Sequence, residues 1–385
     1  MADHYTARQM LERLVAIPTI SRDSNLPLID FVADYLTQHG VETHRTYDDT
    51  GTKASLHALI GPPVAGGVIL SGHTDVVPVE GQDWTTDPFT LTERNGKLYA
   101  RGTCDMKGFV ATALAAVPDM LNANLTHPIM LALSYDEEVG CLGAPPMIDR
   151  ITAELPAARA CIVGEPSMMK LVDGHKGSIG LNVHVHGFEV HSSLVHTGVS
   201  AVMTAARLIT WMHDTMQANR AAAPSDTGFE PPWTTLHAGV IHGGTAHNIT
   251  AKDCTFVIDI RVAPHESVDE WEDRFRAKAA ELEAEIQQIR PEASIQIERR
   301  GRVPGLLPET DGAAEALVRR LTGDNSTEKV SYGTEGGQFQ ERGVSTVICG
   351  PGSIEQAHQP DEFLSLEQLA EGERFIARLI AELQN

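Results

Sequence analysis

The chain has 385 residues, more than a typical single domain holds, so two domains are expected. Its apolar fraction of 42% is ordinary for a globular protein and is enough to form real cores. The formal net charge of −22, from 30 Lys and Arg against 52 Asp and Glu, argues against a nucleic-acid-binding protein, because binding to phosphate needs a basic surface.

Helix and strand patterns alternate through the first part of the chain. Apolar residues recur with helical spacing in 6–17, 27–39 and 107–122. Short apolar runs that are typical of buried strands occupy 67–71, 129–134 and 160–163. This alternation predicts an α/β domain with a doubly wound sheet.

The pattern changes near residue 177. Strand patterns then appear at 179–186, 234–241, 254–262 and 294–298, with helix patterns at 201–219 and 267–289. The resulting order, β-α-β-β-α-β, predicts a ferredoxin-like α+β unit.

After about residue 300 the α/β pattern returns, with a strand at 344–349 and helices at 311–321 and 366–383. His73 in the first part and His358 in this last part are both candidate metal ligands of one site. We therefore expect the middle domain to be an insertion. The expected domains are therefore residues 1–176 and 300–385, which form one α/β catalytic domain, and the inserted residues 177–299.

Five short segments place carboxylates and imidazoles together, and strand-like runs lead into four of them. The side chains concerned are His73, Asp105, Glu137 with Glu138, Glu165 and His358. Ligands of open α/β sheets bind at the carboxyl ends of the strands, so these groups should meet at one edge of the sheet. Two His and several Asp or Glu residues are the composition of a two-metal hydrolytic site.

Each segment taken alone also has an ordinary structural interpretation. His73 would be a turn residue and Asp105 the N-cap of the helix that follows it. The acidic pair Glu137 and Glu138 would be a solvated turn, and His358 a polar loop residue. The metal-site interpretation depends on the five segments occurring together.

The five segments, in this order and spacing, resemble the M20 family of two-zinc amidohydrolases and peptidases. They are Ser-Gly-His73-Thr-Asp75, Gly-Thr-Cys-Asp105-Met-Lys-Gly, Tyr-Asp-Glu137-Glu138-Val-Gly, Val-Gly-Glu165-Pro-Ser and Gln-Ala-His358-Gln-Pro-Asp. The resemblance covers nearly the whole chain. It implies a catalytic domain with a mixed sheet and an inserted ferredoxin-like dimerisation (lid) domain, and therefore a homodimer.

The resemblance implies a role for each residue of the expected metal site. His73, Asp105 and Glu165 would bind one zinc ion, and His358, Asp105 and Glu138 the other, so that Asp105 bridges both. Cobalt or manganese would fit the same nitrogen and oxygen ligands. Glu137 would be the general base, and Asp75 would hold the second ring nitrogen of His73. A cis peptide bond is also implied between Asp105 and Met106.

Further residues are implied for binding the substrate. His191 of the inserted domain would cross a dimer interface and stabilise the oxyanion. Asn248 and Arg261 match positions that hold a substrate carboxylate, which the planar fork of Arg can bind through two hydrogen bonds. Glu335 is a candidate for the side-chain ammonium of the substrate on charge alone.

The C-terminal segments resemble the acetylornithine deacetylase branch of that family. These are Tyr332-Gly-Thr-Glu-Gly-Gly-Gln-Phe339 and the stretch from Gly350 to Glu362. The expected reaction is the hydrolysis of N2-acetyl-L-ornithine to L-ornithine and acetate, a step of arginine biosynthesis. The alternatives are succinyl-diaminopimelate desuccinylase, N-acyl-amino-acid hydrolase, carboxypeptidase, dipeptidase, and a metal-free binding protein with the same fold.

Cysteine usage and the N-terminus predict a cytoplasmic protein without a membrane anchor. The five cysteines are scattered and form no C-x-x-C pair, which favours buried free thiols in a reducing compartment. The first residues contain no apolar signal core. No stretch approaches the ~20 apolar residues that a membrane-spanning helix needs.

Overall fold

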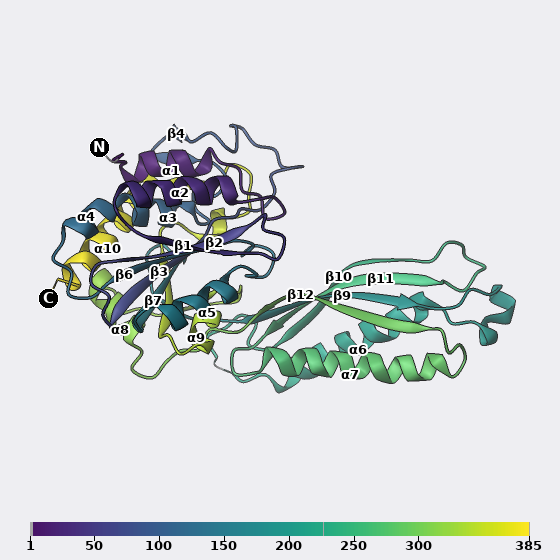
Figure 1. The fold of residues 1–385 in the computed structure, drawn as a ribbon. Coiled ribbons are helices and arrows are strands. Elements are labelled where there is room, and N and C mark those ends of the chain that lie inside the picture. The colour runs from purple at the N-terminus through teal and green to yellow at the C-terminus, as the bar shows by residue number, and fades with distance from the viewer. Residues whose placement is uncertain (1–2, 226, 385) are drawn as a thin grey trace. The chain divides into compact units, whose positions relative to one another are not determined.

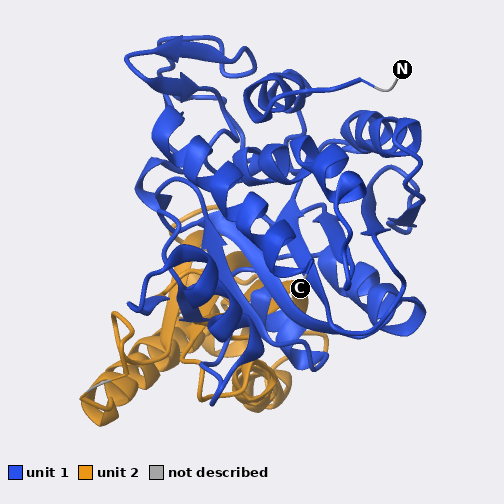
Figure 2. Ribbon diagram, turned by 90° about the vertical axis from the view of Figure 1, so that its left-hand side faces the viewer, with its two compact units in different colours: residues 1–174, 306–329, 334–385 blue, residues 175–305, 330–333 orange. Residues whose placement is uncertain are grey.

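The computed structural model describes residues 3–225 and 227–384, so the chain's two ends and residue 226 lie outside the described residues. Contacts divide the chain into two compact units (Figure 2). The first comprises the residues up to Gly174, Leu306–Lys329 and those from Thr334 onward. The second comprises His175–Gly305 and Val330–Gly333.

The first unit is built on a sheet that has eight strands in the described chain (Figure 1). Its strand order is β1-β2-β6-β3-β7-β14-β8-β13. The strands are β1 (Thr43–Tyr47), β2 (Ala54–Ile60), β3 (Gly67–His73), β6 (Ile129–Ser134), β7 (Ala158–Pro166), β8 (Val172–His175), β13 (Glu328–Val330) and β14 (Thr346–Gly350).

The four central strands run parallel to one another. β3 pairs in parallel with both β6 and β7, and β7 pairs in parallel with β14. All residues of β3, β6 and β14 are buried, as expected for strands covered on both faces. The flanking pairs β2–β6, β1–β2 and β14–β8 are antiparallel, so the predicted mixed sheet is confirmed.

Helices bury both faces of this sheet. One large core packs α1 (Ala7–Val15), α2 (Leu26–Gln38), α3 (Lys107–Ala115), α8 (Ala313–Thr322) and α10 (Leu366–Glu382) against it. Two further helices, α5 (Ala144–Glu154) and α9 (Gly336–Glu341), contact β6 and β14 respectively.

The prediction of a single helix over 107–122 is wrong, because the structure contains two helices there. α3 ends at Ala115, and α4 (Val117–Asn122) begins with Pro118 in its first turn. Proline has no N–H to donate to the preceding turn, so it ends one helix and begins the next.

The first unit also contains a separate, small sheet of three strands. It consists of β4 (Thr92–Arg94), β5 (Lys97–Tyr99) and β15 (Phe363–Ser365). Short 3₁₀ turns occupy Ser192–Thr197 and Ile354–Gln356. Within the described residues, every helix is too short or too polar to cross a bilayer.

The second unit has the β-α-β-β-α-β order that the sequence predicts. Its sheet order is β10-β11-β9-β12, the arrangement of a ferredoxin-like unit. The elements are β9 (Gly177–His186), α6 (Ala201–Ala222), β10 (Thr235–Gly243), β11 (Asp253–Val262), α7 (Val268–Gln287) and β12 (Ser294–Val303). Alternate residues of β9 and β11 are buried against the two helices. The other residues form what we term the open face of this sheet.

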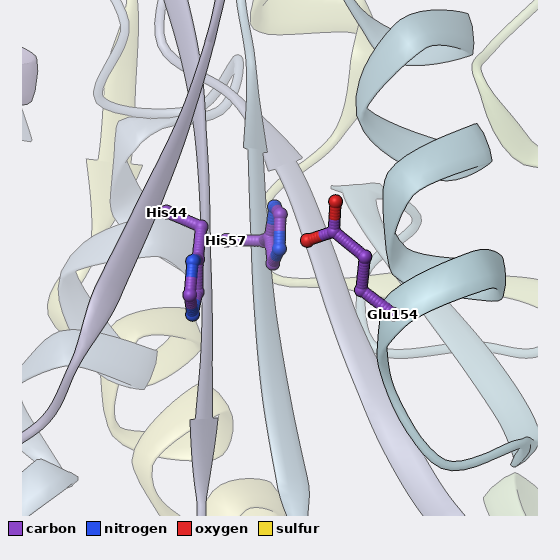
Figure 3. A group of neighbouring side chains, drawn as sticks. All are labelled: His44, His57 and Glu154. Carbon is purple, nitrogen blue, oxygen red and sulfur yellow. The ribbon is translucent and has the colours of Figure 1, made fainter.

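Two stacked histidines, of which only His57 is buried, connect the first two strands of the large sheet (Figure 3). His44 on β1 and His57 on β2 are register partners, and their rings stack with centroids 5.1 Å apart. His57 is fully buried, and neither of its ring nitrogens has a hydrogen-bond partner among the described protein atoms. Burial lowers the pKa of His57 to about 4, so this imidazole is neutral in the folded protein at pH 7.

We expect His57 to weaken the fold in acid. Between its ordinary pKa of about 6.5 and its folded pKa of about 4, the unfolded chain takes up a proton that the folded chain does not. Stability should therefore fall as the pH is lowered through this window, and His57→Phe should reduce the fall. Urea unfolding at several pH values measures it, with His213→Phe, a change at an exposed histidine of α6, as the control. The same pH dependence in His57→Phe and the wild type would contradict this assignment.

Candidate active site

The strand ends of the first unit bring the predicted ligands together. His73 is the last residue of β3, Glu165 lies near the end of β7, and Glu138 follows β6. His358 lies in the loop after β14, and Asp105 directly precedes Met106, the N-cap of α3. These positions share the carboxyl edge of the parallel strands, where ligands of α/β sheets bind.

Asp105 lies at the centre of the cluster. Its Oδ1 is 3.0 Å from Nε2 of His73, and its Oδ2 is 3.3 Å from Nε2 of His358. Nε2 of His73 is also 3.5 Å from Oε1 of Glu165, and Nε2 of His358 is 2.9 Å from Oε2 of Glu138. Two groups of three side chains therefore share one aspartate, with a different oxygen facing each group.

Glu137 belongs to the same cluster. Ligand atoms of His73, Glu137 and Glu165 lie within 4.8 Å of one another, as do those of His73, Asp105 and Glu138. The neighbouring acid points elsewhere, because Lys53 Nζ contacts both carboxylate oxygens of Asp136, at 2.6 and 2.7 Å. Adjacent residues thus have different roles: one acid forms an ion pair, and the next two enter the site.

The electrostatics of the cluster favour cations. Burial, with the charge of Asp105 nearby, raises the pKa of Glu137 to about 8 and that of Glu138 to about 7, and also raises the pKa of Glu165. Burial alone would raise the pKa of Asp105 too, but hydrogen bonds from His358 and His73 hold it below its usual range. Carboxylates buried side by side repel one another unless positive charge is present.

The residues present fit a pair of divalent cations. Oε1 of Glu138 is buried and has no hydrogen-bond partner among the described protein atoms, although a buried carboxylate oxygen is costly to leave unpaired. Imidazole nitrogens and carboxylate oxygens in this number are suitable ligands for zinc and similar metals.

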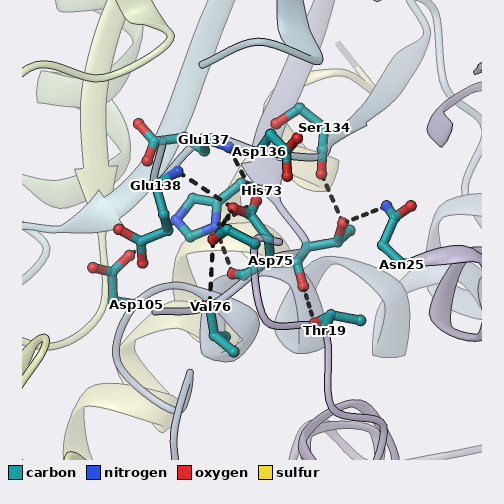
Figure 4. Close-up of polar contacts among 12 residues, drawn as sticks. Thr19, Asn25, His73, Asp75, Val76, Asp105, Ser134, Asp136, Glu137 and Glu138 are labelled. Atoms are coloured by element: carbon teal, nitrogen blue, oxygen red, sulfur yellow. Dashed lines mark hydrogen bonds and ion pairs between the residues drawn. The ribbon is translucent and has the colours of Figure 1, made fainter. Parts of the chain in front are cut away.

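Asp75 holds the site by a different route from the one expected. Nδ1 of His73 is 2.9 Å from the main-chain oxygen of Asp75 but 3.6 Å from its carboxylate, which is too long for a hydrogen bond (Figure 4). The carboxylate instead accepts from the backbone N–H groups of Glu137 and Glu138, at 3.1 and 3.3 Å, and from the hydroxyl of Ser21 at 2.7 Å. Asp75 thus fixes both the imidazole and the acidic turn.

A buried glutamate that the sequence interpretation gave no role holds the Asp105 loop. Glu362 forms a 2.7 Å ion pair with Arg101, and both side chains are 1% exposed. The carboxylate of Glu362 also accepts from the N–H groups of Gly102, Cys104 and Asp105. Its signal in the sequence was its place inside a recognised motif, four residues after His358.

Two other details of the site concern Asp105 and Glu137. The peptide bond between Asp105 and Met106 is cis, as the resemblance implied. Met106 is the N-cap of α3 and makes no side-chain cap, so the N-cap interpretation of Asp105 is not the one observed. Cys141, buried like the other four cysteines, has its Sγ 3.1 Å from Oε1 of Glu137 and donates the thiol proton.

Three of the predicted substrate-binding residues lie on the second unit and are at least partly exposed. His191 and Asn248 lie on neighbouring segments, because Ser192 N–H donates to the main-chain oxygen of Asn248 at 2.9 Å. Nε of Arg261, at the end of β11, donates to Asp259 at 2.9 Å.

The remaining candidate, Glu335, lies on the first unit and is 1% exposed. Its carboxylate accepts hydrogen bonds from the hydroxyls of Ser71 on β3 and Ser134 on β6. These bonds connect Glu335 to the ends of two strands that supply the site. Binding of a substrate ammonium by this residue stays a prediction.

Known proteins resemble this chain over almost its whole length. The profile of the peptidase family M20/M25/M40 matches residues 69–382. An acetylornithine deacetylase of Myxococcus xanthus is 37% identical over 97% of this chain and 96% of its own length. The acetylornithine deacetylase of Proteus mirabilis (strain HI4320) is 33% identical, with 97% and 95% covered. A dinuclear metal-binding M20 peptidase of Bacillus subtilis has a similar fold, with a TM-score of 0.63, 14% identity and 98% of each chain covered.

We expect Glu362→Ala to loosen the metal site without touching a ligand. The change leaves the buried charge of Arg101 without its carboxylate and frees three backbone N–H groups beside Asp105. Metal affinity should fall about 10–100-fold, as for other supports of ligating residues. Metal analysis after dialysis against graded chelator measures it.

The control for this change is Glu80→Ala, which removes an exposed ion pair with Arg22. Exposed pairs contribute about 0–1 kcal/mol, so Glu80→Ala should leave metal content unchanged. Wild-type metal affinity in Glu362→Ala would show that the loop does not need this support.

Proposed function

Because the chain belongs to the peptidase family M20/M25/M40, we propose that it is a metal-dependent amidohydrolase that converts N2-acetyl-L-ornithine to L-ornithine and acetate. The observation that carries the proposal is Asp105, whose two carboxylate oxygens face two separate groups of ligating side chains. The choice of substrate is supported by similarity to acetylornithine deacetylases over nearly the full length.

The five proposed ligands would hold two cations of the zinc class. His73 and Glu165 would bind one, His358 and Glu138 the other, and Asp105 both. When bound, such a pair polarises the amide carbonyl and lowers the pKa of a water molecule. Zn²⁺ is our proposal for the ion, because imidazole and carboxylate donors suit it, although Co²⁺ and Mn²⁺ accept the same donors.

Glu137 would be the general base and then the general acid. It lies among the ligands without being required by either group of three, and its carboxylate is held by the thiol of Cys141. Burial raises the pKa of this carboxyl group from its ordinary value toward neutrality, where a group can both accept and return a proton. Glu137 would take a proton from the attacking water and return it to the nitrogen of the leaving ornithine.

His191 would stabilise the oxyanion that forms on the carbonyl carbon. Its Nδ1 accepts the backbone N–H of Ser193 at 3.2 Å, so in the neutral ring the proton resides on Nε2. That tautomer presents an N–H donor, the group that an oxyanion requires. We propose, with the resemblance as support, that the donor comes from the partner chain of a homodimer.

Arg261 and Asn248 would bind the α-carboxylate of the substrate. Asp259 holds Nε of Arg261, which orients the guanidinium group and leaves its terminal nitrogens to form the fork that recognises a carboxylate. We further propose that the enzyme acts in the cytoplasm and that its ornithine serves arginine biosynthesis, as expected from the similarity to acetylornithine deacetylases.

Glu137→Gln should separate catalysis from metal binding. The amide cannot accept the proton, so turnover should fall about 100–10,000-fold while both ions stay bound. Steady-state kinetics and metal analysis of the same preparation measure the two properties. The adjacent Glu138→Gln is the matched comparison, since it should lower metal content as well. Turnover of Glu137→Gln close to wild type would remove this residue from the proposed role.

A substrate panel tests the choice of acyl amino acid. The metal-loaded enzyme should hydrolyse N-acetyl-L-ornithine with a kcat/KM at least about tenfold above the other substrates, a difference of about 1.4 kcal/mol in transition-state binding. The panel also contains N-succinyl-diaminopimelate, N-acetylmethionine and a dipeptide, with Glu137→Gln enzyme as the blank. A preference for any of the other three would replace the proposed substrate and leave the amidohydrolase chemistry standing.

A further inference from the structure

Outside the active site, the described residues include two more groups of His and acidic side chains whose ligand atoms lie close together. The first is His44, His57 and Glu154. Its two rings lie face to face, with an angle of 18° between their planes (Figure 3). A metal ion must lie in the plane of each ring, along the nitrogen lone pair, so stacked rings cannot share one without turning. Glu154 is also already paired with Arg150, at 2.9 Å.

The second group lies on the second unit, and its three side chains point toward one another. His184 and His186 are two residues apart on β9, so their side chains leave the same face of the sheet. Asp253, the first residue of β11, is the register partner of His186. The three side chains therefore share the open face at one end of the sheet.

Both imidazoles point at the same carboxylate oxygen. Oδ1 of Asp253 is 2.9 Å from Nε2 of His184 and 3.0 Å from Nδ1 of His186. All three ligand atoms lie within 4.8 Å of one another. In a tetrahedral zinc site, bonds of about 2.0–2.1 Å place neighbouring ligand atoms about 3.3–3.4 Å apart. Small side-chain movements would therefore convert these hydrogen bonds into a coordination shell.

The site is accessible, and its charge suits a cation. The side chains of His184, His186 and Asp253 are 40%, 35% and 53% exposed, so an ion can enter from solvent with water as a further ligand. Asp253 supplies a negative charge directly at the point where a cation would bind.

We propose that His184, His186 and Asp253 form a third metal site, which binds one divalent transition-metal ion of the zinc class. Two imidazole nitrogens select such ions over calcium and magnesium, which prefer oxygen ligands. The bound ion would connect the end of β9 to the start of β11. His186, the last residue of β9, lies five residues before His191 along the chain. The proposed ion would therefore lie at the strand end that leads into the loop carrying His191.

Calorimetric titration of the enzyme with Zn²⁺ tests the proposal. The protein first receives its two active-site ions and is freed of excess metal. The wild type should then bind one more ion per chain. His184→Ala and His186→Ala should each weaken this step at least tenfold, while circular dichroism and amide hydrolysis stay at wild-type values. Cu²⁺ bound at the same step should show electron paramagnetic resonance couplings to two nitrogens in the wild type and to one in each variant.

His237→Ala is the matched control. This histidine is exposed on β10 of the same sheet and faces an aspartate, Asp259, in register, but it has no second imidazole at i+2 along its strand. It should keep the third ion at wild-type affinity. The proposal is overturned if the wild type binds no third ion, or if the ion remains with unchanged affinity in His184→Ala and His186→Ala. Neither result depends on which amide the enzyme hydrolyses.

Discussion

Four carboxylates and two imidazoles meet at the carboxyl edge of the parallel strands, and the repulsion among those acids is the constraint that the site has to satisfy. Asp105, Glu137, Glu138 and Glu165 lie close enough that burial and mutual charge raise the pKa of three of them. Buried charges of one sign are stable only with compensating charge nearby. The arrangement therefore suits bound cations. Asp105 joins the two groups of ligands into one site, because one of its carboxylate oxygens faces His73 and the other faces His358.

The framework around the site limits how its parts can move. Gly164 precedes the ligand Glu165, and a Cβ atom at this position would lie 2.0 Å from the ring of Phe109, so α3 packs directly on β7 only because the residue is glycine. Gly108 brings the first turn of α3 equally close to the Asp105 loop, since its Cβ would lie 2.3 Å from the main-chain oxygen of Thr103. Because the packing is this close, the positions of Asp105 and Glu165 are fixed relative to the strands.

Much of this arrangement could be predicted from the sequence, because the apolar runs before His73 and Glu138 are long enough to indicate buried parallel strands, and their ends share an edge by topology. Other parts depend on contacts that no local pattern encodes. β1 and β2 are antiparallel additions whose histidines interrupt the apolar pattern. The break between α3 and α4, by contrast, has a local signal in Pro118, which lies inside an otherwise continuous apolar run. The motif includes Glu362, but its contacts with the Asp105 loop span some 260 residues, so only the folded structure shows what this side chain supports.

The direct test of the central claim is anomalous X-ray scattering at the zinc absorption edge from a crystal of the metal-loaded protein. Within the first unit, the account predicts two peaks about 3.5–4 Å apart, one beside His73 and Glu165 and the other beside His358 and Glu138, with the carboxylate of Asp105 between them. A single peak in this unit, or two peaks that leave Asp105 out of contact with both ions, would contradict it.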